Sequence, residues 1–303
     1  MTTGSRILSK IVTERRTFPL ALPRSLPARL GLGAALGYAA LVGITGVAYR
    51  TFLYPAPKAG LEPQVKGTSL WRLPSERGEV IALFAAPQAD RPVIAFFHGN
   101  GEELVDNSRL ARQLVGAGFG ILFVEYPGYG MAQGQKTDEH AIYDAAERAL
   151  RELDGRGYGA DRVVLVGQSL GTGVATEMAL RSKGARLVLI SPYTSIPDMV
   201  RRFVPFLPVG WIVRDRFDTL EKATSIRVPT LVVHGDADPL IPISMGRRVG
   251  DAISGARFEV IERAGHNDMW SNGRLFELLT EFGGMAKAGA KGAGAGSAPG
   301  PAN

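Results

Sequence analysis

The stretch "RVVLVGQSLGTGVATEMAL", residues 162–180, changes character in its middle. Its first part is an apolar, β-branched run typical of a buried strand, and its last part has the spacing of a helix with small residues on one side. Between them lies the pentapeptide GQSLG at 167–171, in which Ser169 has a glycine two positions away on each side. This pattern predicts a sharp strand-to-helix turn that presents the Ser169 hydroxyl.

The rest of the central chain alternates between strand-like and helix-like segments. The expected strands are Val93–Phe97, Ile121–Glu125, Val163–Val166, Leu187–Ile190, Thr230–Val233 and Phe258–Ile261. Helical patterns lie between them at Leu104–Val115, Glu139–Leu153, Gly173–Lys183, Ser244–Ile253 and Gly273–Phe282. Residues 62–87 add two weaker alternating segments, which we expect to be antiparallel edge strands. Apolar strands that alternate with helices predict an α/β fold with a mostly parallel central sheet and helices on both faces.

Polar loops follow four of these strands. They are HGNG at 98–101, the Ser169 turn, HGDAD at 234–238 and AGHND at 264–268. Because the carboxyl ends of parallel strands meet at one edge of a sheet, these loops should converge there, where such sheets bind ligands.

Three side chains from these loops form a candidate catalytic triad. A free serine is a poor nucleophile, so Ser169 needs a histidine as base and an acid that holds the histidine in the right tautomer. His266 follows the last strand, and Asp238 lies far enough into its loop to reach a histidine. The chain order serine, aspartate, histidine is the order typical of a nucleophile placed at such a turn.

The remaining histidines and nearby aspartates have other expected roles. His98 and His234 each precede a glycine at a strand end, so we expect them to brace their loops through backbone hydrogen bonds. His140 begins a polar helix and should be solvated. We expect Asp236 to brace the turn beside its strand and Asp268 to order its own loop.

Two groups are candidates for the oxyanion hole. The turn aims the backbone N–H of Leu170 at the oxyanion that forms when Ser169 attacks. The second donor should come from the loop after Val93–Phe97, where Asn100 is the candidate. Asn100 can also serve as a left-handed turn residue, and the two roles are compatible.

Composition and charge exclude several classes. The chain has 303 residues, no cysteine and a formal net charge of +6, so disulfides, thiolate catalysis and cysteine zinc sites are excluded. Residues 1–49 carry a net charge of +5 and residues 284–303 a net charge of +2, whereas residues 50–283 hold 27 basic and 28 acidic residues. Because the central part has no basic stripe, we do not expect nucleic-acid binding. No motif predicts a metal or an organic cofactor.

The N-terminal region contains a candidate membrane anchor. Residues 30–49, "LGLGAALGYAALVGITGVAY", are uncharged and lie between Arg29 and Arg50. Twenty residues at helical rise span a bilayer's hydrocarbon core. The basic N-terminus should stay in the cytoplasm, which places the following domain on the opposite side.

Two alternatives to an uncleaved anchor stay open. Small residues at 46–48 resemble a signal-peptide cleavage site, although the preceding basic region is long. A buried helix of the globular domain is disfavoured because the run lacks a polar face. The spacing of Gly33 and Gly37 provides a small face that would allow a weak homodimer through this helix.

The segments together predict a domain organisation. We expect a basic segment at 1–29, a transmembrane anchor at 30–49, a catalytic domain at 50–283 and a disordered Gly/Ala/Pro-rich tail at 284–303. A lid should lie inside the catalytic domain at about 193–226.

Several stretches together resemble a known family. They are FLYP, FFHGNGEEL, EYPGYG, VVLVGQSLGTGVATEMAL, LISPYTSI, RDRFDTLEKATSIRVPTLVVHGDADPLIP and AGHNDMW. They are similar to the α/β-hydrolase superfamily and, more narrowly, to the membrane-anchored Bem46 and α/β-hydrolase domain protein group, often annotated serine aminopeptidase-like. In this resemblance the nucleophile, acid and base fall on Ser169, Asp238 and His266. Met131, Ala132 and Gly101 depart from the group's usual residues near the mouth of the site.

The resemblance implies a serine hydrolase that acts on an ester, thioester or amide. We favour a membrane-anchored esterase or thioesterase with an acyl or lipid-like substrate, because the lid combines aromatic residues with arginines. The candidate pocket residues are Tyr126, Phe203, Phe206 and Trp211.

Two other functions remain open. An aminopeptidase-like enzyme would need an anionic pocket for the substrate amine, which Glu102 or Glu103 could supply. The second alternative is a membrane protein of the hydrolase fold that acts only as a binding or scaffold module, in which the triad would catalyse no reaction.

Overall fold

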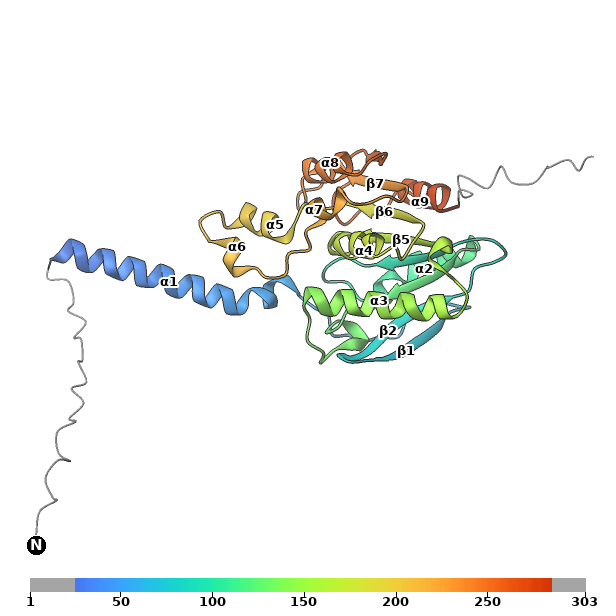
Figure 1. Ribbon diagram of the computed structural model, residues 1–303, viewed down its shortest axis with the longest axis horizontal. Helices are drawn as coiled ribbons and strands as arrows, with labels where there is room; N and C mark the ends of the chain where they lie inside the picture. The colour runs from blue at the N-terminus through green and yellow to red at the C-terminus, as the bar shows by residue number, and fades with distance from the viewer. Residues whose placement is uncertain (1–24, 285–303) are drawn as a thin grey trace, which may run out of the picture. The chain divides into compact units, whose positions relative to one another are not determined.

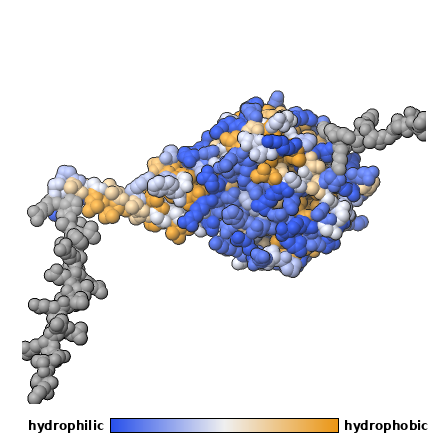
Figure 2. Space-filling view, in the orientation of Figure 1, coloured by the Kyte–Doolittle hydropathy of each residue, from blue (hydrophilic) through white to orange (hydrophobic). Residues whose placement is uncertain are grey.

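The structure, a computed structural model, describes residues 25–284, and its contacts divide the chain into two compact units at Thr45–Gly46. The first unit contains most of helix α1 (Leu26–Leu53), which has no buried residue and is long and apolar enough to cross a membrane. Figure 2 shows the apolar surface of α1. A Cβ at Gly33 or Gly37 would meet nothing within 4 Å, so the small face is open, and pairing through it stays a prediction. The expected tail lies almost wholly outside the described residues.

The second unit is built on an eight-stranded sheet (Figure 1). Its strands are β1 (Ser69–Ser75), β2 (Gly78–Ala85), β3 (Val93–Phe97), β4 (Gly120–Val124), β5 (Val163–Gln168), β6 (Arg186–Ile190), β7 (Thr230–Gly235) and β8 (Arg257–Ile261). Their order is β1-β2-β4-β3-β5-β6-β7-β8. β1 pairs with β2, and β2 with β4, in antiparallel register, and the remaining pairs are parallel. The predicted parallel sheet with an antiparallel edge is therefore confirmed.

Helices cover both faces of this sheet. α2 (Ser108–Gly116) and α9 (Arg274–Gly284) bury leucines in a core with one face of the strands, where Ile94, Phe96 and Val166 lie. On the other face lie α3 (Glu139–Gly155), α4 (Leu170–Leu180) and α8 (Ile243–Ala252); Figure 1 shows α3 and α4 in front of the strands. The residues of β3, β4, β5 and β7 are buried on both faces, which explains why these strands read as continuous apolar runs.

The short helices complete the connections. They are η1 (Leu104–Asn107), η2 (Gly130–Ala132), η3 (Ala160–Arg162), α5 (Ile196–Phe203), α6 (Val209–Ile212) and α7 (Thr219–Ala223). The last three fall in the predicted lid between β6 and β7. α5 begins after Ser195, whose Oγ accepts a hydrogen bond from the N–H of Asp198, a normal N-terminal cap.

Two helix predictions differ from the structure. The helix expected at Leu104–Val115 is divided into the 3-10 helix η1 and the α-helix α2, which meet at Asn107, where φ is −90° and ψ is 8°. The helix expected from Gly173 begins three residues earlier, at Leu170, immediately after Ser169. The early start matters for the site, because it brings the first N–H groups of α4 next to the serine.

Candidate active site

Ser169 occupies a strained turn between β5 and α4. Its φ is 51° and its ψ is −117°, a region that L-residues rarely adopt. A Cβ at Gly171 would clash with the carbonyl of Phe97, and a Cβ at Gly167 would clash with the carbonyl of Gly171. Only glycine fits at these two positions, as the sequence predicted for the turn. The backbone N–H of Ser169 donates to the carbonyl of Ile190 at 2.9 Å, which fixes the turn to β6.

The structure brings Ser169, His266 and Asp238 into one hydrogen-bonded chain. His266 Nε2 lies 2.9 Å from Ser169 Oγ, and His266 Nδ1 lies 2.7 Å from Asp238 Oδ2. His266 follows β8 and Asp238 follows β7, so the three loops meet at the carboxyl ends of parallel strands. In this geometry the carboxylate accepts the Nδ1–H proton, which leaves Nε2 free to accept the serine proton.

Asp238 is held as a carboxylate. Its Oδ1 accepts hydrogen bonds from the N–H groups of Leu240 and Ile241 at 2.9 and 2.8 Å. Burial favours a higher pKa, but the neighbouring His234 and His266 and the hydrogen bond from the Ile241 N–H outweigh it, so the pKa of Asp238 lies well below its usual range. The lowered pKa favours the ionised carboxylate, which can orient His266.

The other histidines contact backbone rather than the serine. His98 Nδ1 donates to the carbonyl of Gly99 and His234 Nε2 donates to the carbonyl of Ile241, each at 2.9 Å. The predicted bracing of both loops is confirmed. His234 also lies 3.6 Å from Asp238, which places it behind the acid. His140 is exposed, as expected. Asp236 Oδ1 accepts the N–H of Arg263 at 2.6 Å, so it ties the β7 loop to the β8 loop.

The HGNG loop lies beside the serine. A Cβ on Gly99 would be 3.6 Å from the Cβ of Ser169. The Asn100 side chain is already bonded, since its Nδ2 donates to the Leu53 carbonyl at 2.6 Å and its Oδ1 accepts from the Tyr129 hydroxyl at 2.6 Å. The Asn100 side chain therefore has a structural role, and the backbone N–H of Asn100 is the candidate oxyanion donor. The left-handed turn conformation belongs to Gly101, with φ 80°, and its assignment to Asn100 is wrong.

A series of side-chain hydrogen bonds, which we did not predict from the sequence, joins three of the loops. The Trp270 indole Nε1–H donates to Gln168 Oε1 at 2.7 Å, and Gln168 Nε2 donates to Glu102 Oε1 at 3.3 Å. Glu102 Oε2 in turn accepts the N–H of Gly99 at 3.2 Å. Gln168 directly precedes Ser169, and Trp270 lies four residues after His266. This closeness in sequence to the triad residues is the one signal that could have identified Gln168 and Trp270.

The four candidate pocket residues differ in their surroundings. Tyr126 is fully buried, stacks on His98 with ring centroids 4.0 Å apart, and donates its hydroxyl to the His98 carbonyl at 2.8 Å. Phe203, Phe206 and Trp211 lie on the surface of the lid. Tyr126 thus supports the HGNG loop from inside the core, and the composition of an acyl pocket stays a prediction.

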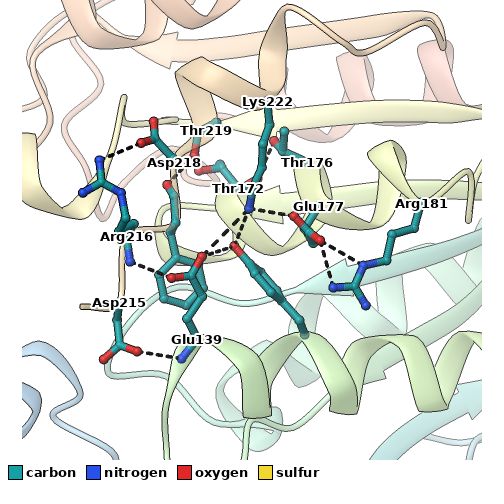
Figure 3. Close-up of polar contacts among 12 residues, drawn as sticks. Glu139, Thr172, Thr176, Glu177, Arg181, Asp215, Arg216, Asp218, Thr219 and Lys222 are labelled. Atoms are coloured by element: carbon teal, nitrogen blue, oxygen red, sulfur yellow. Dashed lines mark hydrogen bonds and ion pairs between the residues drawn. The ribbon is translucent and has the colours of Figure 1, made fainter. Parts of the chain in front are cut away.

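The second compact unit, which carries the candidate triad, is called the catalytic unit below. Polar contacts fasten the second half of the lid to the rest of this unit (Figure 3). Lys222 of α7 reaches Glu177 of α4 at 2.6 Å and the Tyr143 hydroxyl of α3 at 3.0 Å. Glu139 Oε2 accepts the Arg216 N–H at 2.6 Å, and Asp215 Oδ1 accepts the Glu139 N–H at 3.0 Å. Because α4 begins at the nucleophile turn, these contacts join the lid to the helix that presents Ser169.

Asp215 also forms hydrogen bonds with the C-terminal end of α1. Its Oδ2 accepts hydrogen bonds from the Tyr49 hydroxyl at 2.8 Å and from Arg50 Nε at 2.7 Å. The last two turns of α1, from Gly46, belong to the catalytic unit, so this contact lies within one compact body. Among residues 25–284 no group of three or more His, Cys, Asp or Glu side chains could hold a metal ion.

The geometry of the candidate triad agrees with the proteins to which this chain is similar. The sequence profile of the serine aminopeptidase S33 family matches residues 88–220. An uncharacterised protein of Mycobacterium tuberculosis is 32% identical over 180 residues, which are 58% of this chain and 63% of that protein. The α/β-hydrolase domain-containing protein 17B of Xenopus tropicalis is 30% identical over 223 residues, which are 69% of this chain and 72% of the relative.

A solved structure shares the fold. An esterase of Pyrococcus furiosus superposes with a TM-score of 0.62 at 15% identity and covers 75% of this chain and 96% of its own. At that identity the likeness concerns the fold alone. The chain spans 63% of the length of the first curated relatives, so it matches about two thirds of those proteins. With the parallel sheet, the strained serine turn and these relatives, the chain belongs to the α/β-hydrolase family.

Proposed function

We propose that this protein is a membrane-anchored serine hydrolase that cleaves a carboxylic ester or thioester through an acyl-enzyme on Ser169. The observation that carries the proposal is the chain Ser169 Oγ, His266 and Asp238, with contacts of 2.9 and 2.7 Å. Such a chain, at a strained strand-to-helix turn, has the geometry of an activated serine nucleophile.

The proposed reaction has two halves. His266 Nε2 takes the Oγ proton as Ser169 attacks the substrate carbonyl carbon, and the N–H groups of Leu170 and Asn100 stabilise the resulting oxyanion. Collapse breaks the bond to the leaving alcohol or thiol, which receives the proton from His266. Water, deprotonated by His266, then attacks the acyl-enzyme and releases the acid.

An acyl or lipid-like substrate is the favoured class. The support is the lid between β6 and β7, which presents aromatic side chains and arginines, and a helix long enough to cross a membrane in the same chain. We propose that α1 remains as an anchor, with the N-terminus cytoplasmic and the catalytic unit on the opposite side. An intact-mass measurement of protein from membranes tests this, because a cleaved signal peptide would remove α1.

A fluorophosphonate probe tests the catalytic proposal. Folded wild-type protein should be labelled, whereas Ser169→Ala should not, with circular dichroism as the control for folding. Folded wild type without label would contradict the role of Ser169 and favour the non-catalytic scaffold. Equal labelling of Ser169→Ala would show that the probe reacts with another residue, and the role of Ser169 would again be wrong. A panel of p-nitrophenyl acyl esters of increasing chain length would then define the substrate.

The aminopeptidase-like alternative has weaker support. Glu102 already accepts hydrogen bonds from the Gly99 N–H and the Gln168 side chain. Glu103 is buried and accepts the Gly60 N–H at 3.0 Å. Both carboxylates proposed to hold a substrate amine are thus engaged within the protein. Faster turnover of amino-acid p-nitroanilides than of acyl esters would nevertheless establish the peptidase and exclude the esterase.

A further inference from the structure

The first half of the lid presents an exposed aromatic surface. Phe203 at the end of α5 is 61% exposed, Phe206 is 62% exposed, and Trp211 of α6 is 90% exposed. Aromatic side chains contribute strongly to binding when they are buried, and Trp is enriched at binding interfaces. We call these three residues, together with Arg201, Arg202 and Arg214, the lid patch.

The lid patch is also basic. Arg201, Arg202 and Arg214 are exposed. The one acidic residue of segment 196–214 is Asp198, which forms an ion pair with Arg201 at 2.7 Å. Exposed aromatic residues beside cationic side chains are the composition of surfaces that lie at an anionic membrane interface.

The lid patch lies close to the end of the candidate membrane helix. Tyr49 and Arg50, in the last turns of α1, bind Asp215. Trp211 precedes Asp215 by four residues, which span at most about 14 Å of extended chain. Phe52, on the last turn of α1, is 82% exposed. If α1 crosses a bilayer, the end of the span marks the level of the interface, and the lid patch is tethered next to it.

We propose that the lid patch docks onto the surface of an anionic bilayer, where Trp211 and Phe203 enter the interface and Arg202 and Arg214 bind lipid phosphates. The proposal rests on the anchoring given under Proposed function. A second copy of this chain or a soluble protein would also fit an aromatic and basic surface. The position of the patch beside the end of a candidate membrane helix favours a bilayer.

Fluorescence quenching by lipid tests this docking. The full chain is reconstituted into vesicles of phosphatidylcholine and phosphatidylglycerol whose acyl chains are brominated, and its emission is compared with that in unbrominated vesicles. Wild type should be quenched, and Trp211→Phe should lose most of the bromine-dependent quenching. Trp71→Phe is the matched control and should keep it, because Trp71 is buried in the catalytic unit.

Charge variants test the lipid headgroup. The double variant Arg202→Gln/Arg214→Gln should lose the dependence of quenching on phosphatidylglycerol, whereas Arg109→Gln/Arg112→Gln, exposed on α2, should retain it. Equal quenching in wild type and Trp211→Phe would overturn the proposal. So would Trp211 emission that responds to protein density in the vesicle and not to bromination, which would indicate a second copy.

An alkaline wash separates failure of the docking from failure of the anchor. A chain that stays in the vesicles while Trp211 is unquenched is anchored and has an undocked lid. A chain that the wash removes has no membrane anchor, which would overturn the anchoring and this proposal together. Fluorophosphonate labelling of Ser169 is unaffected by either result.

Discussion

The indole N–H of Trp270 donates a 2.7 Å hydrogen bond to the side-chain oxygen of Gln168, the residue directly before Ser169. Trp270 belongs to the loop that carries His266, so this bond joins the base loop to the nucleophile turn across 102 residues of sequence. Through Gln168 and Glu102 it continues to the Gly99 N–H of the HGNG loop. Three of the four strand-end loops are thus held together by side chains outside the candidate triad.

Replacing Trp270 by Phe should lower activity without removing any triad group. The variant keeps a ring but loses the bond to Gln168, so the distance between His266 and Ser169 should become less well fixed. A misplacement of about 1 Å can cost up to about 100-fold in rate, and we expect kcat to fall by about 10-fold with KM little changed. The measurement is the kcat and KM of wild type and variant on one acyl ester.

Trp71→Phe provides the matched control for this prediction. Trp71 is buried on β1 and stacks on Phe84, away from the loops of the site. A loss of kcat of the same size in Trp71→Phe would show that tryptophan loss acts through general destabilisation, and the positioning role of Trp270 would be wrong.

The acid of the triad is tested by a pair of substitutions in one loop. Asp238→Asn keeps acceptors for the Leu240 and Ile241 N–H groups but loses the charge that holds the His266 tautomer. By analogy with other serine triads, kcat should fall by about 10⁴-fold. Asp236→Asn keeps its contact with the Arg263 N–H and should retain activity within a few fold. Similar losses in both variants would contradict the assignment of Asp238.

Much of this site could be predicted from the sequence, and the physical reason is local. Apolar runs located the parallel strands to within about two residues because most of those strands are buried on both faces. The glycines around Ser169 reflect a turn that leaves no room for a Cβ at positions 167 and 171. Contacts between distant loops left no such signal. Nothing in the sequence around Gln168 indicates its bond to Trp270, and the strand-like setting of Tyr126 does not distinguish an inner support from a pocket wall.

The buried pair His98 and Glu125 should make stability fall as pH rises. His98 Nε2 lies 3.4 Å from Glu125 Oε1, and both side chains are almost completely enclosed. Burial alone would lower the pKa of His98, but the Glu125 carboxylate and the Gly99 carbonyl outweigh it, so the pKa is raised. The folded state then holds a proton that the unfolded chain has lost above about pH 6.5.

The sign of the pH effect follows from this proton. The stabilisation is fully present below about pH 6.5 and is lost as pH rises through the higher pKa of the folded state, with a slope of at most about 1.4 kcal/mol per pH unit. Glu125→Gln removes the charge and should flatten the dependence. Denaturant unfolding from pH 6 to 9 measures it, with Glu79→Gln at an exposed pair as control. An unchanged slope in Glu125→Gln would contradict protonation of His98.

Asp215 is the residue that holds the lid, α3 and the end of α1 together, so its loss should loosen all three. Its carboxylate is buried and accepts hydrogen bonds from Tyr49, Arg50 and the Glu139 N–H. Asp215→Asn cannot accept from all of these donors and leaves Arg50 without its counter-charge. Arg50 is one-third exposed, so water replaces part of the interaction. We therefore expect a loss of about 2–3 kcal/mol, below the range for a fully buried pair.

Limited trypsin digestion locates this effect in the lid. Asp215→Asn should be cleaved faster after Arg214 and Arg216 than wild type, because the segment between α6 and α7 loses its attachment to α3. Asp218→Asn is the matched control, since Asp218 pairs with the exposed Arg216 side chain at 3.1 Å and exposed pairs contribute little. If both variants are cleaved and unfold alike, Asp215 does not fasten the lid. The contacts of Lys222 with Glu177 and Tyr143, and the hydrogen bond from the Arg216 N–H to Glu139, would then hold it.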